Sequence, residues 1–257
     1  MVPIRYWVGL PDVEPPVKPE HLHGALSRWF DDEESPATVV GGVGASQSRH
    51  EATIKPYTIS PLAEEPGRRG VLISVLTSDA DARLWRGAGT AGRVRLGRSL
   101  TRVEAPVVDE SMSWAQLDAS RSARAWRLEF VTPTTFRTGN RTSPLPTPTG
   151  ILRTPSDCWR AFSGREPRLY TPQDVTRLWV SDVDLNSQRL LLRVGERSGP
   201  DDRRGERGIC AVTGSMVLRC DDDQVAAIVG PLLRLAPFSG VGGFRGKGFG
   251  VVEVEEL

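Results

Sequence analysis

Cations other than arginine are scarce in this chain of 257 residues. The 33 lysine and arginine residues include only three lysines: Lys18, Lys55 and Lys247. Histidine is as rare, with three residues, at positions 21, 23 and 50. Arginine therefore supplies most of the positive charge by default, and each lysine or histidine is a more informative residue than an arginine.

Cysteine, long apolar runs and metal-binding motifs are also missing or rare. Three cysteines without CxxC spacing indicate neither a disulfide framework nor a zinc knuckle. No histidine and carboxylate pattern has metal-ligand spacing, so we expect no metal and no cofactor. No apolar run approaches the roughly 18 residues of a membrane span and no signal peptide opens the chain. We therefore expect a cytoplasmic protein without a membrane partner.

The charge that is present lies in local clusters. The formal net charge is only +1, which neither favours nor excludes nucleic acid, because affinity for phosphate depends on where the charges lie. Arginines gather at 93, 95, 98 and 102, at 121, 124 and 127, and at 203, 204 and 207. The usual explanation of such a cluster is a solvated face.

A glycine-rich run from Gly240 to Gly250 precedes the last predicted strand. Glycine leaves backbone N–H groups uncovered, so such a loop can approach a phosphate closely while Arg245 and Lys247 supply charge. The run is neither a Walker A loop nor a GxGxxG motif, and it follows a helix instead of opening one. A linear polyanion such as RNA is the better ligand; the alternative is a glycine linker near the chain end.

Hydrophobic periodicity predicts the same order of elements twice, with an additional strand inserted in the second half. In the first half we expect strands at 4–10, 56–60 and 71–76, helices at 19–30 and 80–86, and a weaker extended region at 93–108. In the second half we expect strands at 125–133, 178–183, 188–194, 209–219 and 251–256, and helices around 151–162 and 224–235, with Asn186 and Ser187 at a turn. This order predicts an α+β protein of two tandem ferredoxin-like (RRM-like) domains, 1–120 and 121–257, with antiparallel sheets each backed by helices.

Blocks of sequence support a more specific interpretation by their order along the chain. In the first half they are His21-Leu22-His23, His50 and the segment Lys55 to Leu62; in the second they are Leu128 to Arg137, Pro144 to Pro146, Trp159 to Phe162, and Leu235 to Gly242 leading into the glycine run. With these blocks the chain resembles the CRISPR-associated protein six family, repeat-processing endoribonucleases of the RAMP superfamily.

The resemblance implies an activity. Such an enzyme binds CRISPR repeat RNA, as precursor and as mature guide RNA, and cuts the precursor without metal. A general base takes the proton of a ribose 2′-hydroxyl, and attack on the adjacent phosphorus leaves a 2′,3′-cyclic phosphate and a 5′-hydroxyl. Histidine suits this role because its pKa lies near neutrality. Other CRISPR effector subunits are possible partners.

The resemblance also implies site residues. His50, in the loop after the first helix, is the first choice for the catalytic histidine and His23 the second, with helix capping or packing as the alternative role of His23. Lys55 is placed to stabilise the charged phosphorane. RNA-binding residues implied by the resemblance and the glycine run are Arg28, Arg137, Arg141, Gly242, Gly243, Arg245, Gly246, Lys247 and Gly248.

Two other classes of function stay open at this point. A non-cleaving RAMP subunit that binds guide RNA would have the same folds and glycine run but would lack the pair His50 and Lys55. A small-molecule nucleotide enzyme is disfavoured by the broken phosphate-loop motifs.

Overall fold

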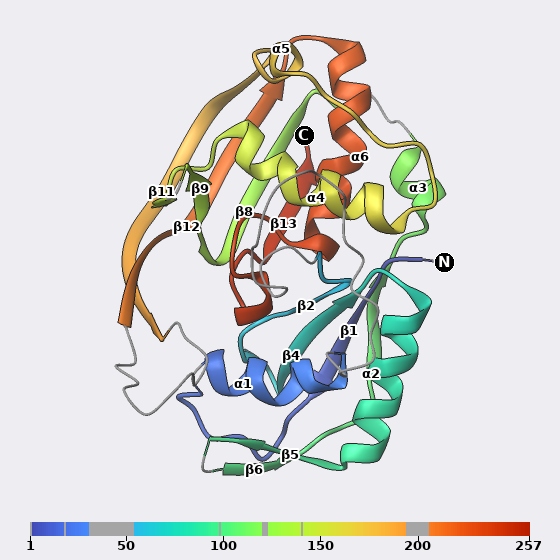
Figure 1. Cartoon of the computed structure of the whole chain (residues 1–257), viewed down its shortest axis with the longest axis vertical. Coiled ribbons are helices and arrows are strands. Elements are labelled where there is room, and N and C mark those ends of the chain that lie inside the picture. The colour runs from blue at the N-terminus through green and yellow to red at the C-terminus, as the bar shows by residue number, and fades with distance from the viewer. Residues whose placement is uncertain are drawn as a thin grey trace, which may run out of the picture.

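Two antiparallel sheets, one from each half of the chain, lie one below the other along the long axis of the molecule (Figure 1). The structure is a computed structural model that describes residues 2–17, 19–30, 54–97, 99–119, 123–139, 141–193 and 206–257. Within these residues no helix is long and apolar enough to cross a membrane. The α+β class predicted from the sequence is confirmed.

The first sheet has the strand order β2-β4-β1-β7, with β3 paired to β4. Its elements are β1 (Ile4–Gly9), α1 (Pro19–Leu26), the 3-10 helix η1 (Ser27–Trp29), β2 (Tyr57–Ile59), β3 (Ala63–Glu65), β4 (Arg68–Val75), α2 (Ser78–Ala91) and β7 (Val107–Ser111). A separate hairpin, β5 (Arg93–Leu96) and β6 (Ser99–Arg102), follows α2. Leu22, Leu26 and Leu84 from the helices pack on one face of the sheet. This is the strand order of a ferredoxin-like unit, in which the first and third strands are central.

The second sheet repeats this order as β11-β12-β8-β13. Its elements are β8 (Ala125–Thr134), β9 (Phe136–Thr138), β10 (Arg141–Ser143), α4 (Pro148–Phe162), α5 (Pro172–Val175), β11 (Leu178–Arg193), β12 (Glu206–Cys220), α6 (Asp223–Ser239), the 3-10 helix η2 (Arg245–Lys247) and β13 (Val252–Glu256). Helix α3 (Trp114–Asp118) connects the sheets. The predicted domain boundary near Ser120 falls on residues 120–122, outside the described part, and stays a prediction.

Three predicted elements differ from the structure. The turn at Asn186 and Ser187 is wrong: β11 runs straight through both, which pair with Thr213 and Val212 of β12. A long neighbouring strand that supplies the hydrogen bonds overrides the turn preference of Asn and Ser. Helix α2 extends beyond 80–86, because the Thr77 hydroxyl accepts from the Ala80 amide and starts it earlier. Helix α6 likewise continues past its predicted end at 235 to Ser239.

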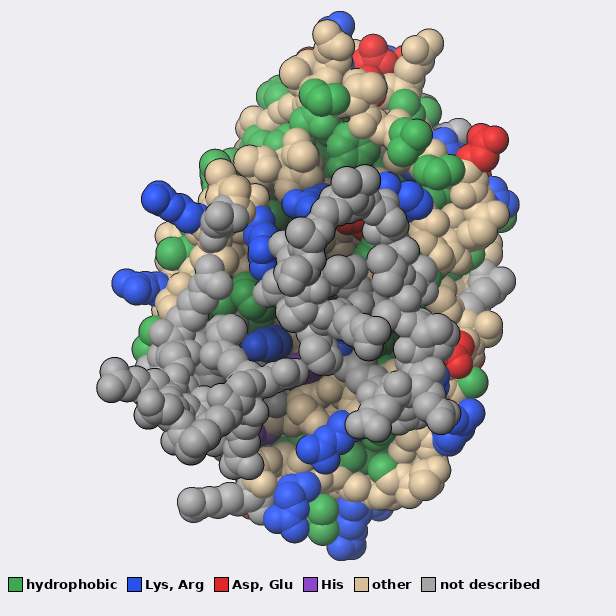
Figure 2. All heavy atoms as spheres, viewed as in Figure 1, with side chains coloured by type: hydrophobic (Ala, Val, Ile, Leu, Met, Phe, Trp, Pro, Cys, Tyr) green, Lys and Arg blue, Asp and Glu red, His purple; other side chains and the backbone are tan. Residues whose placement is uncertain are grey.

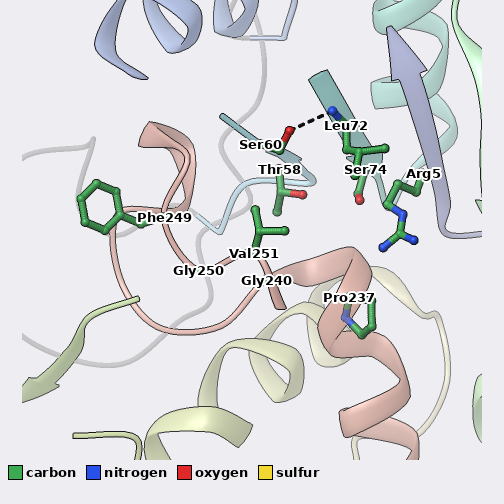
Figure 3. A pocket seen from close by; sticks show the side chains of 10 residues that line it. All are labelled: Arg5, Thr58, Ser60, Leu72, Ser74, Pro237, Gly240, Phe249, Gly250 and Val251. Carbon is green, nitrogen blue, oxygen red and sulfur yellow. Dashed lines mark hydrogen bonds between the residues drawn. The ribbon is translucent and has the colours of Figure 1, made fainter. Parts of the chain in front are cut away.

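The two halves meet in a close-packed interface. Leu76, at the end of β4, is fully buried in the hydrophobic core of the second half. The Thr58 hydroxyl donates to the carbonyl of Phe238 at 3.4 Å. Figure 3 shows the cavity between β2, β4 and the end of α6, which measures about 10 Å³ and has room for one water molecule at most. The halves therefore form one packed body at this point.

Arg5 of β1 ties the two sheets electrostatically. Its guanidinium contacts Asp109 at 2.8 Å and Glu110 at 3.0 Å on β7, and Glu253 of β13 at 2.9 Å. Burial opposes ionisation of Arg5, but the three carboxylates together raise its pKa above the usual value. Burial raises the pKa of Glu253, and the Arg5 charge opposes this rise. The side chain of Arg5 is only 13% exposed, so these contacts are partly desolvated.

Replacing this arginine should destabilise the fold. We expect Arg5→Met to lower the free energy of unfolding by about 1–3 kcal/mol, because three partly buried carboxylates lose their common partner. Arg124→Met, which breaks an ion pair with Asp223 that is at least half exposed, should change the free energy of unfolding much less, because solvent screens such a pair. Urea unfolding monitored by circular dichroism measures both. Equal effects of the two variants would contradict a structural role for the Arg5 contacts.

Candidate active site

The glycine run of the second half lies against the first half. A Cβ atom at Gly246 would lie 3.2 Å from Cε1 of His23 and 3.8 Å from Cδ of Lys55. A Cβ atom at Gly248 would lie 3.5 Å from the Pro61 ring. Figure 1 shows this loop, with η2, between the two sheets and next to β2. The structure thus brings Gly246, predicted to bind RNA, close to His23 and Lys55, which were predicted to be catalytic.

Helix α1 positions His23. Leu22 and Leu26 are four residues apart on one helix face and are buried in the first core, which fixes the rotation of the helix. His23 is half-buried and points toward the loop at Gly246, whereas His21 is exposed and lies against Gly97 of the β5–β6 turn. Of the two histidines on this helix, only His23 belongs to the site.

Lys55 is held by an aromatic residue of the next strand. Its Nζ donates to the hydroxyl of Tyr57 at 2.9 Å and lies 5.2 Å from the centre of the same ring. Tyr57 is 1% exposed and stacks on Phe30 with 4.1 Å between ring centres. A buried ring therefore limits where the ammonium group can lie. Sequence analysis gave Tyr57 no role, although it lies only two residues after Lys55, at the start of β2.

Two of the glycines are used for packing within the second half. A Cβ atom at Gly242 would lie 2.4 Å from the carbonyl oxygen of Thr135, and its φ of +71° also favours glycine. The amide of Gly243 donates to the same carbonyl at 2.8 Å. The amide of Gly248 donates to the carbonyl of Arg245 at 3.1 Å. In this structure the amides of Gly243 and Gly248 are therefore bound within the protein, and the contact of these glycines with RNA stays a prediction.

Gly246 differs from its neighbours. Within the described part of the chain no hydrogen bond engages its amide. It belongs to the short 3-10 helix η2, which is preceded by Phe244 in the left-handed conformation with φ of +58°. The Phe244 ring packs on Phe249, with 6.0 Å between ring centres, and Nζ of Lys247 lies over the Phe244 ring at 5.9 Å from its centre. This packing fixes the loop around Gly246.

Arg245 turns inward instead of toward solvent. Its guanidinium donates to the carbonyl of Ser239 at the end of α6 and lies 3.7 Å from Sγ of Cys158 on α4. Burial raises the pKa of the Cys158 thiol, and the Arg245 charge only partly opposes this. Arg245 thus caps the carboxyl end of α6 by this hydrogen bond. Its contact with RNA stays a prediction.

The other predicted residues are distributed more widely. Arg28, Arg137 and Arg141 are exposed, the first on η1 and the other two on the β9–β10 hairpin of the second half. Their binding of RNA is a prediction that nothing here tests. His50 lies outside the described residues. Among the described residues, no group of three or more His, Cys, Asp or Glu side chains is placed to hold a metal ion.

Solved structures share this architecture over the whole length of the chain. A Cas6 product complex superposes with a TM-score of 0.73 and 22% identity, covering 99% of this chain and 100% of that one. Thermus thermophilus Cas6 gives a TM-score of 0.66 and 23% identity, covering 99% and 98%. A RAMP protein described as binding different RNA substrates gives 0.54 and 13%, covering both chains fully. No curated protein sequence matches the chain. The fold that the chain shares with these structures is a pair of tandem ferredoxin-like units.

A match to a known family covers the second half of the sequence. Residues 128–252 match the family described as CRISPR-associated endoribonuclease Cas6. This segment begins in β8 and ends in β13, so it contains the whole glycine run. The second half of the chain is thus similar to the Cas6 family, a family of RNA-cleaving enzymes.

A methyl group at position 246 should disturb the site without unfolding the protein. We expect Gly246→Ala to slow RNA cleavage, because its Cβ would press on the His23 ring at 3.2 Å, while the melting temperature changes little. Gly243→Ala is the matched control, since its Cβ would meet Thr135 only at an ordinary 3.7 Å. Single-turnover cleavage and thermal unfolding of both variants measure this. Cleavage by Gly246→Ala at the rate of Gly243→Ala would show that the approach to His23 has no role.

Proposed function

We propose that the chain is a metal-independent endoribonuclease that binds CRISPR repeat RNA and cuts precursor CRISPR RNA into guide units. The observation that carries this proposal is the approach of Gly246 to His23 and Lys55. The structural neighbours include Cas6 complexes with a product and with a substrate mimic, which favours an RNA ligand for the shared fold.

The reaction that fits this group of residues is an attack by the ribose 2′-hydroxyl on the adjacent phosphorus. It needs a base that removes the 2′-hydroxyl proton and an acid that protonates the departing 5′-oxygen. Two imidazoles can fill these roles, and we assign them to His23 and His50. The products are a 2′,3′-cyclic phosphate and a 5′-hydroxyl.

Lys55 and Gly246 act on the charge that develops at phosphorus. The pentacoordinate transition state carries more negative charge on its non-bridging oxygens than the ground state does. A positioned ammonium group and a backbone amide that face these oxygens lower the barrier, and one such donor is typically worth about 3–4 kcal/mol. Tyr57 and Phe30 keep Lys55 in place for this role.

The alternative function is that of a non-cleaving RAMP-type subunit that binds guide RNA within a CRISPR interference complex. Such a protein would need the fold and the basic surface but not the acid and base. Cleavage assays distinguish the two functions directly.

The first test distinguishes catalysis by histidine side chains from catalysis by a metal ion. Wild-type protein should cut the repeat RNA of its own genome in the presence of EDTA. His23→Ala and His50→Ala should each lower the single-turnover rate by about 10² to 10⁴ while RNA affinity is kept. His21→Ala is the matched control, since this exposed histidine of the same helix lies against Gly97 and should leave the rate unchanged. A rate abolished by EDTA, or unchanged in both variants, would refute the mechanism.

The second test removes the nucleophile. A repeat RNA with a single 2′-deoxyribose next to the scissile phosphate should bind normally and remain uncut, because only the attacking oxygen is missing. Product ends are identified by mass spectrometry of the uncut and cut RNA. Cleavage of the deoxy substrate, or a 3′-hydroxyl product, would indicate an activated water instead.

A further inference from the structure

The β5–β6 hairpin presents arginine side chains on one face. Arg93 and Arg95 alternate with Val94 and Leu96 along β5; the arginines are exposed and the two apolar residues are buried in the first core. Arg102 of β6 is directly opposite Arg93. Because side chains opposite each other share a face, three guanidinium groups lie on the outer surface of one short hairpin.

Like charges opposite each other destabilise a hairpin, and the protein compensates for them only in part. Arg102 lies 3.7 Å from Glu104, and its amide donates to Asp12. Within the part of the chain that the structure describes, neither Arg93 nor Arg95 forms an ion pair. Among the described residues, Arg93 and Arg95 therefore retain positive charge that no ion pair neutralises.

The hairpin lies beside the helix that carries the candidate catalytic histidine. Helix α1 contacts β5, and the turn residue Gly97 approaches His21 so closely that a Cβ atom there would lie 2.7 Å from Nδ1. His21 is two residues before His23. Figure 2 shows Lys and Arg side chains gathered at the lower end of the molecule, where Figure 1 places β5 and β6. The arginine face is thus an outlying part of the surface around the active site.

We propose that the outer face of the β5–β6 hairpin binds the phosphodiester backbone of the substrate RNA at a distance from the scissile phosphate. Arg93 and Arg95 contact phosphates, and Arg102 adds to the local potential. The inference rests on the proposed function, since it takes the RNA held at His23 to extend beyond the cleavage site. Arginine suits this role because its planar fork matches the geometry of phosphate oxygens.

The test is the salt dependence of binding. The double variant Arg93→Ala plus Arg95→Ala should bind labelled repeat RNA more weakly in fluorescence anisotropy. The slope of log Kd against log salt should fall by about 1.4, since each phosphate contact to a single strand contributes about 0.7. Single-turnover cleavage at saturating RNA should equal that of wild type. Because the hairpin side chains face outward, the melting temperature should not change.

The matched control removes two exposed arginines elsewhere. Arg124 and Arg127 lie at the start of β8, at the opposite end of the molecule from the hairpin (Figure 1), and pair with Asp223 and Glu255. Arg124→Ala plus Arg127→Ala should leave the salt slope unchanged. A slope that is the same in the hairpin variant as in wild type, or reduced equally in the control, would overturn the inference.

A truncation series localises the contact. Repeat RNA is shortened stepwise from the 5′ end or from the 3′ end, and wild type is compared with the hairpin variant. The difference in RNA affinity between wild type and the hairpin variant should disappear when the RNA is shortened from one end and persist when it is shortened from the other. A difference that persists in both would contradict a contact away from the cleavage site. Failure of the proposed function can be distinguished from failure of the hairpin contact, because wild-type protein would then not cut the RNA at all.

Discussion

The absence of a side chain at Gly246 is the constraint on which the site depends. A Cβ atom there would lie 3.2 Å from the His23 ring, so glycine at this position lets the loop of the second half approach α1 closely. The contact also needs the two sheets to be packed together. Leu76 buried in the second core and the Arg5 contacts to both sheets supply that packing. The packing of the two halves therefore also places the groups of the candidate active site.

This arrangement divides the work between the two halves. The first half supplies His23 and Lys55, the groups that can transfer protons or carry charge. His23 lies on α1, which packs into the first core, and Lys55 lies just before β2 and donates to the buried Tyr57. The second half supplies backbone at close range and a loop fixed by its own aromatic packing. A phosphate held between them would meet an imidazole, an ammonium group and an amide from different directions. We regard this division as the reason why both units are needed for the proposed reaction.

The sequence predicted most of the fold because its apolar periodicity is regular, and both sheets have the predicted order. It failed where long-range pairing overrides local preference, as at Asn186 and Ser187 in β11. The site was predictable only through the resemblance, since no spacing rule connects His23 with Gly246. The inward turn of Arg245 toward Ser239 and Cys158 depends on tertiary contacts and could not be foreseen. The sequence also contains a capping box from Ser113 to Gln116, which indicates the start of α3, a helix that the periodicity analysis missed.

The central claim is that the reacting phosphate lies between His23, Lys55 and Gly246. A crystal structure of the chain with repeat RNA that carries a 2′-deoxyribose at the cleavage position measures this directly. The account predicts non-bridging oxygens of the scissile phosphate within about 3 Å of Lys55 Nζ and of the Gly246 amide, with the His23 ring within hydrogen-bond reach of the reacting oxygens. A scissile phosphate bound elsewhere, with these three groups facing protein or solvent, would contradict it.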